Sequence, residues 1–199
     1  IKNGLLFASD AIKVYKTEID GENLDDIKLL IPPQLSTLLS CLSDEQVTVY
    51  TDKDNTLVEL VTDNITVVGP LAENAEGYPI MTDLFEQEFT HTVSICGNQV
   101  IAAVDRLHLF LSAYDDGVMN FVFTETELSI CTSNKSIESI PYVTPCEGVE
   151  FVCSLSCKHL KDAITCANSE IIEMGIGNNE LISITTPRTS ILLAVSEEE

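Results

Sequence analysis

Residues 160–195 read LKDAITCANSEIIEMGIGNNELISITTPRTSILLAV, and this stretch decides the fold because an earlier part of the chain repeats its pattern. Residues 35–71 read LSTLLSCLSDEQVTVYTDKDNTLVELVTDNITVVGPL. Each copy opens with apolar residues at helical spacing and continues with three runs of strand-like composition. The pattern predicts a short helix followed by three strands in both copies. The offset of about 125 residues has the size of a domain, so the repeat is one of whole domains.

The turns between the predicted strands recur at the same offset. Asp54-Asn55 takes the place that Asn178-Asn179 has in the second copy, and Thr62-Asp63-Asn64 takes that of Thr186-Pro187-Arg188. All four are turn-forming sequences between runs that favour strands. The matching turns favour a true repeat over a chance similarity of the two stretches.

A related unit lies between the two copies. Its pattern predicts a strand at 90–95, an amphipathic helix at about 99–113, a hairpin of 118–124 and 127–132, and a further strand at 137–143. We therefore expect an α+β protein built from repeated helix-plus-strands units.

The repeat also predicts the domain boundaries. We expect a first domain at 1–76, a linker at 77–84 and a complete second domain at 85–199. Counting the offset backwards, the first domain should have begun about 40 residues before Ile1, so the N-terminal part of that domain is expected to be missing.

Composition narrows the class of protein. The chain has 199 residues, 45% of them hydrophobic, and carries 32 acidic and 10 basic side chains for a net charge of −22. Such hydrophobic content favours soluble domains over a disordered acidic tail. The charge excludes a surface that binds nucleic acid or anionic lipid everywhere, but it permits a localised basic lining.

Other sequence features bear on the cellular compartment. No apolar stretch approaches the ~20 residues that span a bilayer, so we expect no membrane segment and no classical secretion. Seven cysteines without a C-x-x-C pair are best explained as buried free thiols in a reducing cytoplasm.

Three of the ten bases, Arg106, Lys158 and Lys161, are predicted on the exposed faces of the second and third helices. Solvated helices carry such residues routinely, which is the plainer interpretation. The alternative is a small positive lining that follows a phosphate backbone. The first helix weakens this alternative, because its outer positions Gln34, Thr37 and Cys41 carry no charge.

Catalytic and metal-binding patterns are missing from the sequence. The three histidines, His91, His108 and His159, have no partner at metal-ligand spacing, and the pair Cys153 and Cys157 has no second pair. No phosphate-binding loop, nucleophile elbow or dinucleotide fingerprint occurs. We expect a protein that is not an enzyme and needs no cofactor or metal.

Three stretches carry a resemblance to a known family. Residues 6–14, LFASDAIKV, resemble a strand motif of its middle domain, and residues 71–84 resemble its linker into the last domain. Residues 151–164, FVCSLSCKHLKDAI, resemble its segment phenylalanine-asparagine-x-x-tyrosine-leucine-x-aspartate-alanine-leucine. Their order and spacing match the DNA sliding clamps, in particular the bacterial clamp, which is the beta subunit of the replicative polymerase. The resemblance covers nearly the whole chain, although each motif is short.

The sequence departs from the family at several positions. Ser9 and Lys13 are conservative replacements, whereas Ala11 stands for a glycine and Ile80 for an aspartate. The end of the chain, Ala194-Val195-Ser196 and three glutamates, replaces a segment like methionine-proline-methionine, which could change partner preference.

The resemblance implies a ring with helices lining the hole and antiparallel sheets outside, which slides on double-stranded DNA without reading its sequence. It implies that Arg106, Lys158 and Lys161 face DNA, and that a DNA polymerase and a clamp loader bind through short peptide motifs. The family's peptide pocket falls on Ser9, Ala11, Val14, Pro79, Asp83, Leu84, Leu192 and Ala194. The plainer interpretation of Val14, Leu84 and Leu192 is ordinary core.

Six domains close such a ring, so a two-domain chain would form a homotrimer, as in phage, and a three-domain chain a homodimer, as in bacteria. The repeat arithmetic and the acidity tilt the expectation toward a phage or mobile-element clamp in the host cytoplasm. Two rival hypotheses remain: a clamp-like ring that acts as a non-replicative protein-binding scaffold, and an enzyme with an unrecognised site among the acidic residues.

Overall fold

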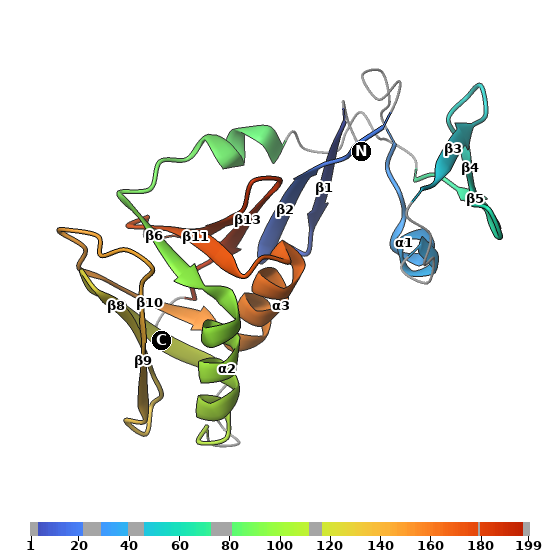
Figure 1. Ribbon diagram of the computed structural model, residues 1–199. Coiled ribbons are helices and arrows are strands. Elements are labelled where there is room, and N and C mark those ends of the chain that lie inside the picture. Colours follow the sequence, from blue (N-terminus) through green and yellow to red (C-terminus); the bar gives the residue numbers. More distant parts are fainter. Residues whose placement is uncertain are drawn as a thin grey trace. The chain divides into compact units, whose positions relative to one another are not determined.

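The computed structural model describes residues 4–21, 29–39, 46–72, 81–111, 117–178 and 180–196. The chain divides into two compact units (Figure 1). The smaller comprises Ile1–Leu6 and Ile19–Met81, and the larger comprises Phe7–Glu18 and Thr82–Glu199.

The smaller unit has one helix beside one antiparallel sheet. Its side chains alternate between buried and exposed along the central strand, with Val58 and Leu60 buried, so that one face of the sheet forms a core. Leu35 from the helix and Leu29 and Leu71 from the flanking segments complete this core. The elements are α1 (Pro33–Leu39), β3 (Thr48–Thr51), β4 (Leu57–Val61) and β5 (Thr66–Pro70), in the sheet order β3-β4-β5.

The larger unit repeats a strand, a helix and three strands. The first half is β6 (His91–Cys96), α2 (Gly97–His108), β7 (Val118–Phe123), β8 (Glu127–Cys131) and β9 (Ile137–Pro141). The second half is β10 (Phe151–Ser156), α3 (Cys157–Ala167), β11 (Ile171–Ile176), β12 (Leu181–Thr185) and β13 (Thr189–Ala194). The 3-10 helix η2 (Met81–Glu86) precedes the first half.

The two halves interlock because each gives its first strand to the sheet of the other. β6 pairs with β11, and β10 pairs with β7. The resulting sheets have the orders β10-β7-β8-β9 and β1-β2-β13-β12-β11-β6, where β1 is Leu5–Ser9 and β2 is Lys13–Glu18. One continuous core of buried side chains, most of them aliphatic or aromatic, therefore serves both halves.

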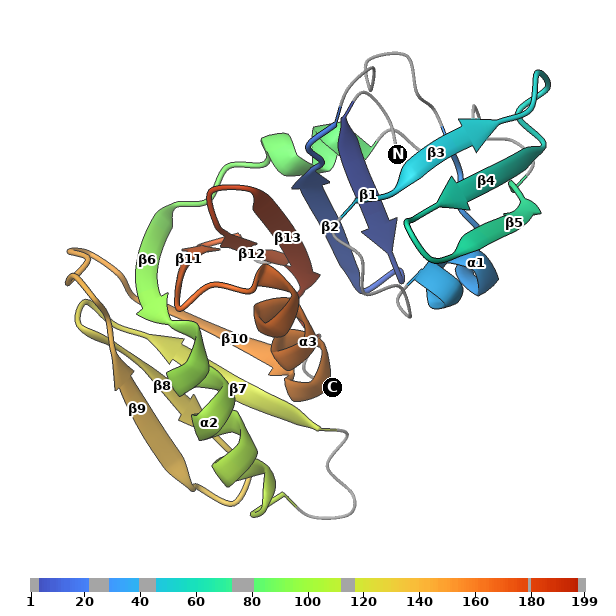
Figure 2. The same ribbon diagram turned by 45° about the vertical axis from the view of Figure 1, so that its right-hand side comes forward.

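The helices α2 and α3 lie side by side (Figure 2). Each helix follows its strand without a loop, and its first amide donates to a backbone carbonyl of the other half. Gly97 N donates to Glu170 O at 3.0 Å, and Cys157 N donates to Gly117 O at 2.8 Å. A Cβ atom on Gly97 would lie 2.9 Å from Ile164 Cγ2, so glycine allows α2 to begin this close to α3.

The turn between the second and third strands has the same hydrogen bonds in both copies. The amide of Thr62 donates to the carbonyl of Ile65 at 2.9 Å, and Thr62 Oγ1 accepts from the amide of Ile65 at 3.1 Å. Thr186 does the same with Thr189, at 3.2 Å. A threonine that closes the turn between the second and third strands is thus a shared feature of both copies.

Several expectations need correction. The helix expected at 99–113 is α2 and ends at His108, because the amides of Leu109 and Phe110 turn back to carbonyls three residues earlier in a tighter, 3-10-like turn. Residues 112 and 113 lie outside the described part of the chain. The other predicted strands of this unit agree with β6 to β9 within two residues.

The division of the chain also differs in one segment. Residues 7–18, which the sequence places with the first domain, belong to the larger unit because β2 pairs with β13 from Thr17↔Thr189 to Lys13↔Leu193. Backbone pairing over five residues outweighs position in the sequence. The expected linker lies mostly in residues 73–80, outside the described part.

The cysteines are more varied than the sequence suggests. The six in the described residues are all free thiols, of which Cys153 and Cys157 are buried and Cys166 is exposed; Cys41 lies outside the described residues. Among the helices of the described residues, none has the length and apolar character needed to span a bilayer.

Candidate functional site

The exposed face of α2 and α3 carries the bases that the sequence predicted to face DNA. Arg106 and Lys158 are exposed, and Lys161 is partly buried. The helical spacing that buries Val100, Val104 and Leu107 in α2 leaves Arg106 on the opposite side. In α3, burial of Leu160 and Ile164 has the same effect on Lys158.

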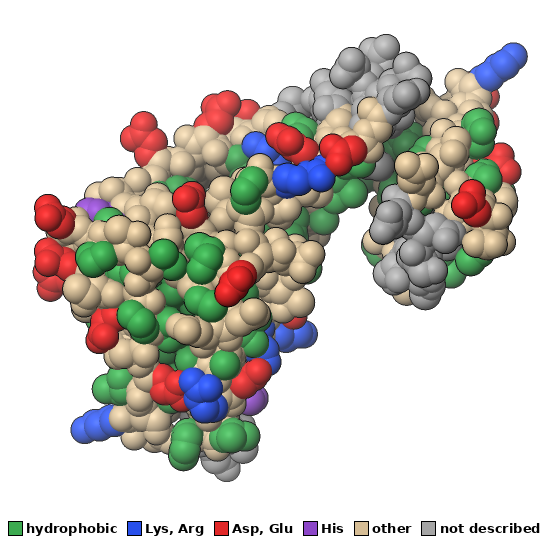
Figure 3. Space-filling view, viewed as in Figure 1, with side chains coloured by type: hydrophobic (Ala, Val, Ile, Leu, Met, Phe, Trp, Pro, Cys, Tyr) green, Lys and Arg blue, Asp and Glu red, His purple; other side chains and the backbone are tan. Residues whose placement is uncertain are grey.

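Two of these three bases are paired with carboxylates. Arg106 Nε donates to Glu138 Oε1 at 2.8 Å and Oε2 at 3.1 Å, and its Nη2 also donates to Oε2. Lys161 Nζ forms an ion pair with Asp105 across the two helices. In Figure 3, acidic side chains flank a basic one over α2. Hydrogen bonding from Arg106 holds the pKa of Glu138 below its usual range, so this carboxylate is ionised at neutral pH.

A hollow of about 200 Å³ lies between α2 and α3. Its lining combines both signs of charge with three less polar side chains: Asp105, Asp162, Lys158, Lys161, His108, Val104 and Cys157. Within the part of the chain that the structure describes, no carboxylate lies at ion-pair distance from Lys158. Lys158 is therefore the base of this face that is best placed to contact an added anion.

Charge is unevenly distributed between helices and the rest of the chain. The three α-helices of the described residues together hold three basic and two acidic side chains. Subtracting these from 10 basic and 32 acidic residues leaves 7 basic and 30 acidic residues elsewhere. The helices thus carry a net +1, against −23 for the remainder.

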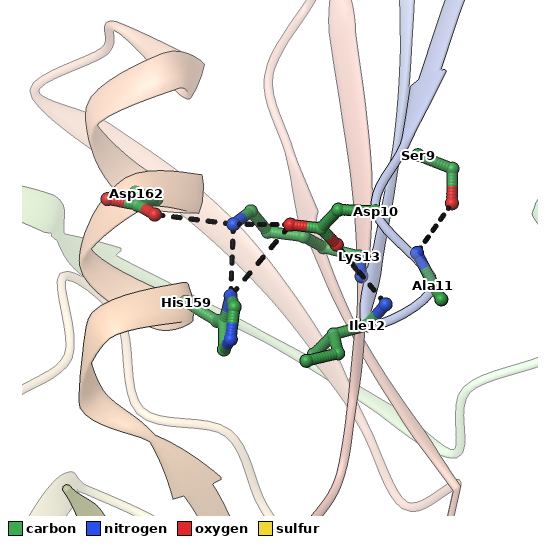
Figure 4. A network of polar contacts seen from close by, with 7 residues as sticks. All are labelled: Ser9, Asp10, Ala11, Ile12, Lys13, His159 and Asp162. Carbon is green, nitrogen blue, oxygen red and sulfur yellow. Dashed lines mark hydrogen bonds and ion pairs between the residues drawn. The ribbon is translucent and has the colours of Figure 1, made fainter.

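A second polar cluster joins β2 to α3, and the sequence did not predict it (Figure 4). The ammonium group of Lys13, a residue only 8% exposed, lies 2.9 Å from Asp10 Oδ2, 3.3 Å from Asp162 Oδ2 and 3.0 Å from His159 Nδ1. Because an ammonium group only donates, Nδ1 of His159 is the acceptor. The cluster brings together residues of the first and third family-like stretches.

The ionisation of the cluster follows from these contacts. Burial opposes the charge of Asp10, but hydrogen bonds from the side chain and backbone of Lys13 and the backbone of Ile12 outweigh it and lower the pKa to about 2. Burial likewise opposes the charge of Lys13, whereas Asp10 and Asp162 raise its pKa above the ordinary value. Both groups are charged throughout the physiological range.

Alternation along β2 gives its two faces different roles. Lys13 and Tyr15 point toward α3 and the core, so Val14 and Lys16 point to the outer face of the sheet. On that face η2 packs against the strands: the Phe85 ring lies 6.3 Å from Phe7, and Lys16 Nζ lies 5.1 Å from its centroid.

The predicted pocket residues of the described part of the chain lie on β1, on β2 and the turn before it, on η2 and on β13. Val14 is the cross-strand partner of Leu192, and Ala194 N donates to Ile12 O at 2.9 Å next to Ala11. Asp83 and Leu84 are exposed on η2, and Ser9 is exposed at the end of β1. Pro79 lies outside the described residues.

Two pocket residues have informative environments. Leu192 is only 3% exposed, whereas Leu84 is 38% exposed. Ala11 has φ of +71°, a left-handed conformation in which its Ser9 and Asp10 neighbours form a tight turn through their side chains. The glycine that the family has here would adopt it without strain.

The comparison with known proteins supports the fold. No family model matches the chain, and no curated protein sequence matches it. The DNA polymerase sliding clamp of Bacillus subtilis matches with a TM-score of 0.84 and 20% identity, over 100% of this chain and 55% of its own. The beta clamp of Helicobacter pylori bound to a DNA ligase peptide matches with 0.81 and 12%, over 98% of this chain and 55% of its own.

The DNA polymerase III beta subunit of Thermotoga maritima matches with a TM-score of 0.76 and 14% identity, over 99% of this chain and 58% of its own. The chain therefore has the fold of the sliding clamps, as the resemblance predicted. It spans a little over half the length of these three structures.

Proposed function

We propose that this chain belongs to a ring that encircles duplex DNA and tethers the replicative polymerase and other partners to it. The observation that carries the proposal is the charge distribution: the α-helices hold a net +1 in a chain of −22. In the sliding-clamp fold the helices face the hole. DNA inside the ring would then meet helices that carry no net negative charge.

The proposed contact with DNA is weak and independent of sequence. Lys158, and to a lesser extent Arg106 and Lys161, would contact phosphate oxygens, which carry no base information. Few contacts also suit sliding, because each phosphate neutralised adds to the affinity and to the barrier for moving along the backbone. The ring itself, instead of tight binding, would keep the protein on DNA.

Partners are proposed to bind on the opposite side of the sheet. Leu84 of η2 is 38% exposed and would offer an apolar side chain to an aliphatic or aromatic anchor of a short extended peptide, with the paired residues Val14 and Leu192 on the sheet as the proposed floor of the site. A DNA polymerase and a clamp loader are the proposed owners of such peptides. Ser9, Ala11, Asp83 and Ala194 would form the rim of this site.

Ring closure requires several copies of the chain. Six domains complete a ring, so the proposed assembly is a trimer of two-domain chains or a dimer of three-domain chains. Sedimentation of the full-length protein measures the number of copies directly.

A second candidate function is a ring that binds proteins without supporting a polymerase. The pairing of Arg106 with Glu138 and of Lys161 with Asp105 favours it, because it removes two bases from the DNA-facing set. Polymerase stimulation on primed circular DNA separates the two functions, since the scaffold predicts none.

The partner site has a specific test. Fluorescence anisotropy measures binding of a labelled peptide of the clamp-binding type, glutamine-x-x-leucine-phenylalanine, to the wild type, to Leu84→Lys and to the control Val152→Lys. Val152 is also an exposed apolar residue, 57% exposed, but lies on the four-stranded sheet. A lysine buried under the peptide should weaken binding at least about tenfold, or about 1.4 kcal/mol.

The expected result is saturable binding that Leu84→Lys weakens and Val152→Lys does not. Absence of saturable binding to the wild type, or an equal loss in both variants, would contradict the assignment of the partner site.

A further inference from the structure

Two of the three bases of the helix face are neutralised within the molecule by carboxylates from two different elements. Glu138 belongs to β9 and reaches Arg106 of α2, while Asp105 of α2 reaches Lys161 of α3. Neither carboxylate is needed to satisfy a buried group, because Arg106 is 59% and Lys161 37% exposed at the side chain. Water could solvate both bases if the carboxylates were removed.

A carboxylate and a phosphate both offer negatively charged oxygens that accept hydrogen bonds from a basic side chain. The guanidinium of Arg106 gives two parallel N–H donors to the two oxygens of Glu138, and this is the geometry with which arginine binds a phosphate group. The donors cannot serve both oxyanions at once. A base that already has an internal counter-charge also releases fewer ions when DNA binds, so it adds less to the affinity.

Lys158 gives the contrast within the same face. It is exposed, it lines the hollow between α2 and α3, and its ammonium group lies at ion-pair distance from no carboxylate of the described residues. One base is therefore available, and two are held back by neighbours that lie against them.

We infer that Asp105 and Glu138 are internal competitors of the DNA phosphates, which set the strength of the grip on the duplex by occupying Lys161 and Arg106. This inference rests on the proposed function. It explains how a face with three bases can remain weakly binding. It also assigns a role in DNA binding to two acidic residues, which a search for positively charged side chains would not identify.

The test removes the two counter-charges and keeps the bases. Binding of the full-length protein to a fluorescein-labelled 30-base-pair duplex is followed by anisotropy between about 50 and 200 mM KCl, for the wild type and for Asp105→Asn/Glu138→Gln. The control Asp63→Asn/Glu150→Gln changes the net charge equally at exposed acids that are not part of a helix. Circular dichroism melts check that all proteins fold.

Freeing two bases should steepen the slope of log affinity against log salt by up to about two, since each phosphate contact contributes about 0.9. The affinity at 50 mM salt should rise at least about tenfold. The control should change the slope little. It removes the same two negative charges but frees no base, and the effect of exposed charges is screened over roughly a Debye length.

Lys158→Glu in the wild-type background separates failure of the inference from failure of the proposed function. An unchanged slope in Asp105→Asn/Glu138→Gln, or an equal gain in the control, would overturn the inference; if Lys158→Glu still weakened binding, the DNA-facing assignment would survive. If Lys158→Glu changed nothing either, both would be overturned.

Discussion

Replacing Lys13 by methionine tests the polar cluster between β2 and α3. Methionine keeps the apolar stem of a side chain that is 9% exposed, but it removes the ammonium group that binds Asp10 at 2.9 Å and Asp162 at 3.3 Å. Hydrogen bonds to charged groups contribute about 1.5–3 kcal/mol each when buried. The two carboxylates are 46% and 48% exposed, so solvent screening reduces the expected total loss to about 2 kcal/mol.

The pH dependence of this loss identifies its cause. Asp10 has a pKa of about 2 in the folded protein and about 3.9 in an unfolded chain. A lowered pKa contributes stability that is fully present above pH 4 and is lost as pH falls from about 4 to 2. The difference in free energy of unfolding between wild type and Lys13→Met should therefore shrink across that window, because progressive protonation of Asp10 weakens an ion pair that only the wild type has.

Urea denaturation followed by circular dichroism at pH 7, 4 and 3 measures these differences. Lys158→Met is the matched control: the same chemical change at an exposed lysine that has no carboxylate partner among the described residues should cost less than about 0.5 kcal/mol. An equal loss in the two variants, or a loss in Lys13→Met that stays constant from pH 7 to pH 3, would refute the role given to the cluster.

Three further predictions concern the same unit. Ala11→Gly should stabilise the protein by about 0.5 kcal/mol in urea denaturation, because it relieves the left-handed φ of +71° at a smaller entropic cost; a loss of stability would contradict this. Leu160→Ala should lower the free energy of unfolding by about 3 kcal/mol, since the side chain is fully buried, and a loss under 1 kcal/mol would show that α3 does not pack as described. At pH 8 a thiol reagent should label exposed Cys166 first, by mass spectrometry, and Cys153 only after unfolding, because burial raises the pKa of the Cys153 thiol to about 12; early labelling of Cys153 would contradict its burial.

Local patterns predicted the elements well because each is encoded within a short window. Alternation in β7 and β8, helical spacing in α2 and α3, and the threonine turns at Thr62 and Thr186 all follow from neighbouring residues. The C-terminal end of α2 did not follow, since Leu109 to Leu111 continue the apolar pattern while the backbone already turns.

Contacts between distant segments could not be predicted in this way. Lys13 and Asp162 are 149 residues apart, and the pairing of Arg106 with Glu138 depends on how α2 packs across β9. Lys13 and Asp162 both lie in stretches that resemble the clamp family, but the resemblance alone did not predict their contact. The transfer of residues 7–18 to the larger unit likewise depends on strand pairing, which no local pattern encodes.

The central claim is that the protein encloses DNA topologically instead of gripping it. The full-length protein is incubated with a linear duplex that has free ends, the ends are then blocked with biotin–streptavidin, and the mixture is passed over a gel-filtration column at high salt, which removes contacts made only through phosphates. A clamp should elute with the end-blocked DNA and should be lost from a duplex whose ends stay open. Loss from both duplexes, or retention that does not depend on the ends, would contradict the claim.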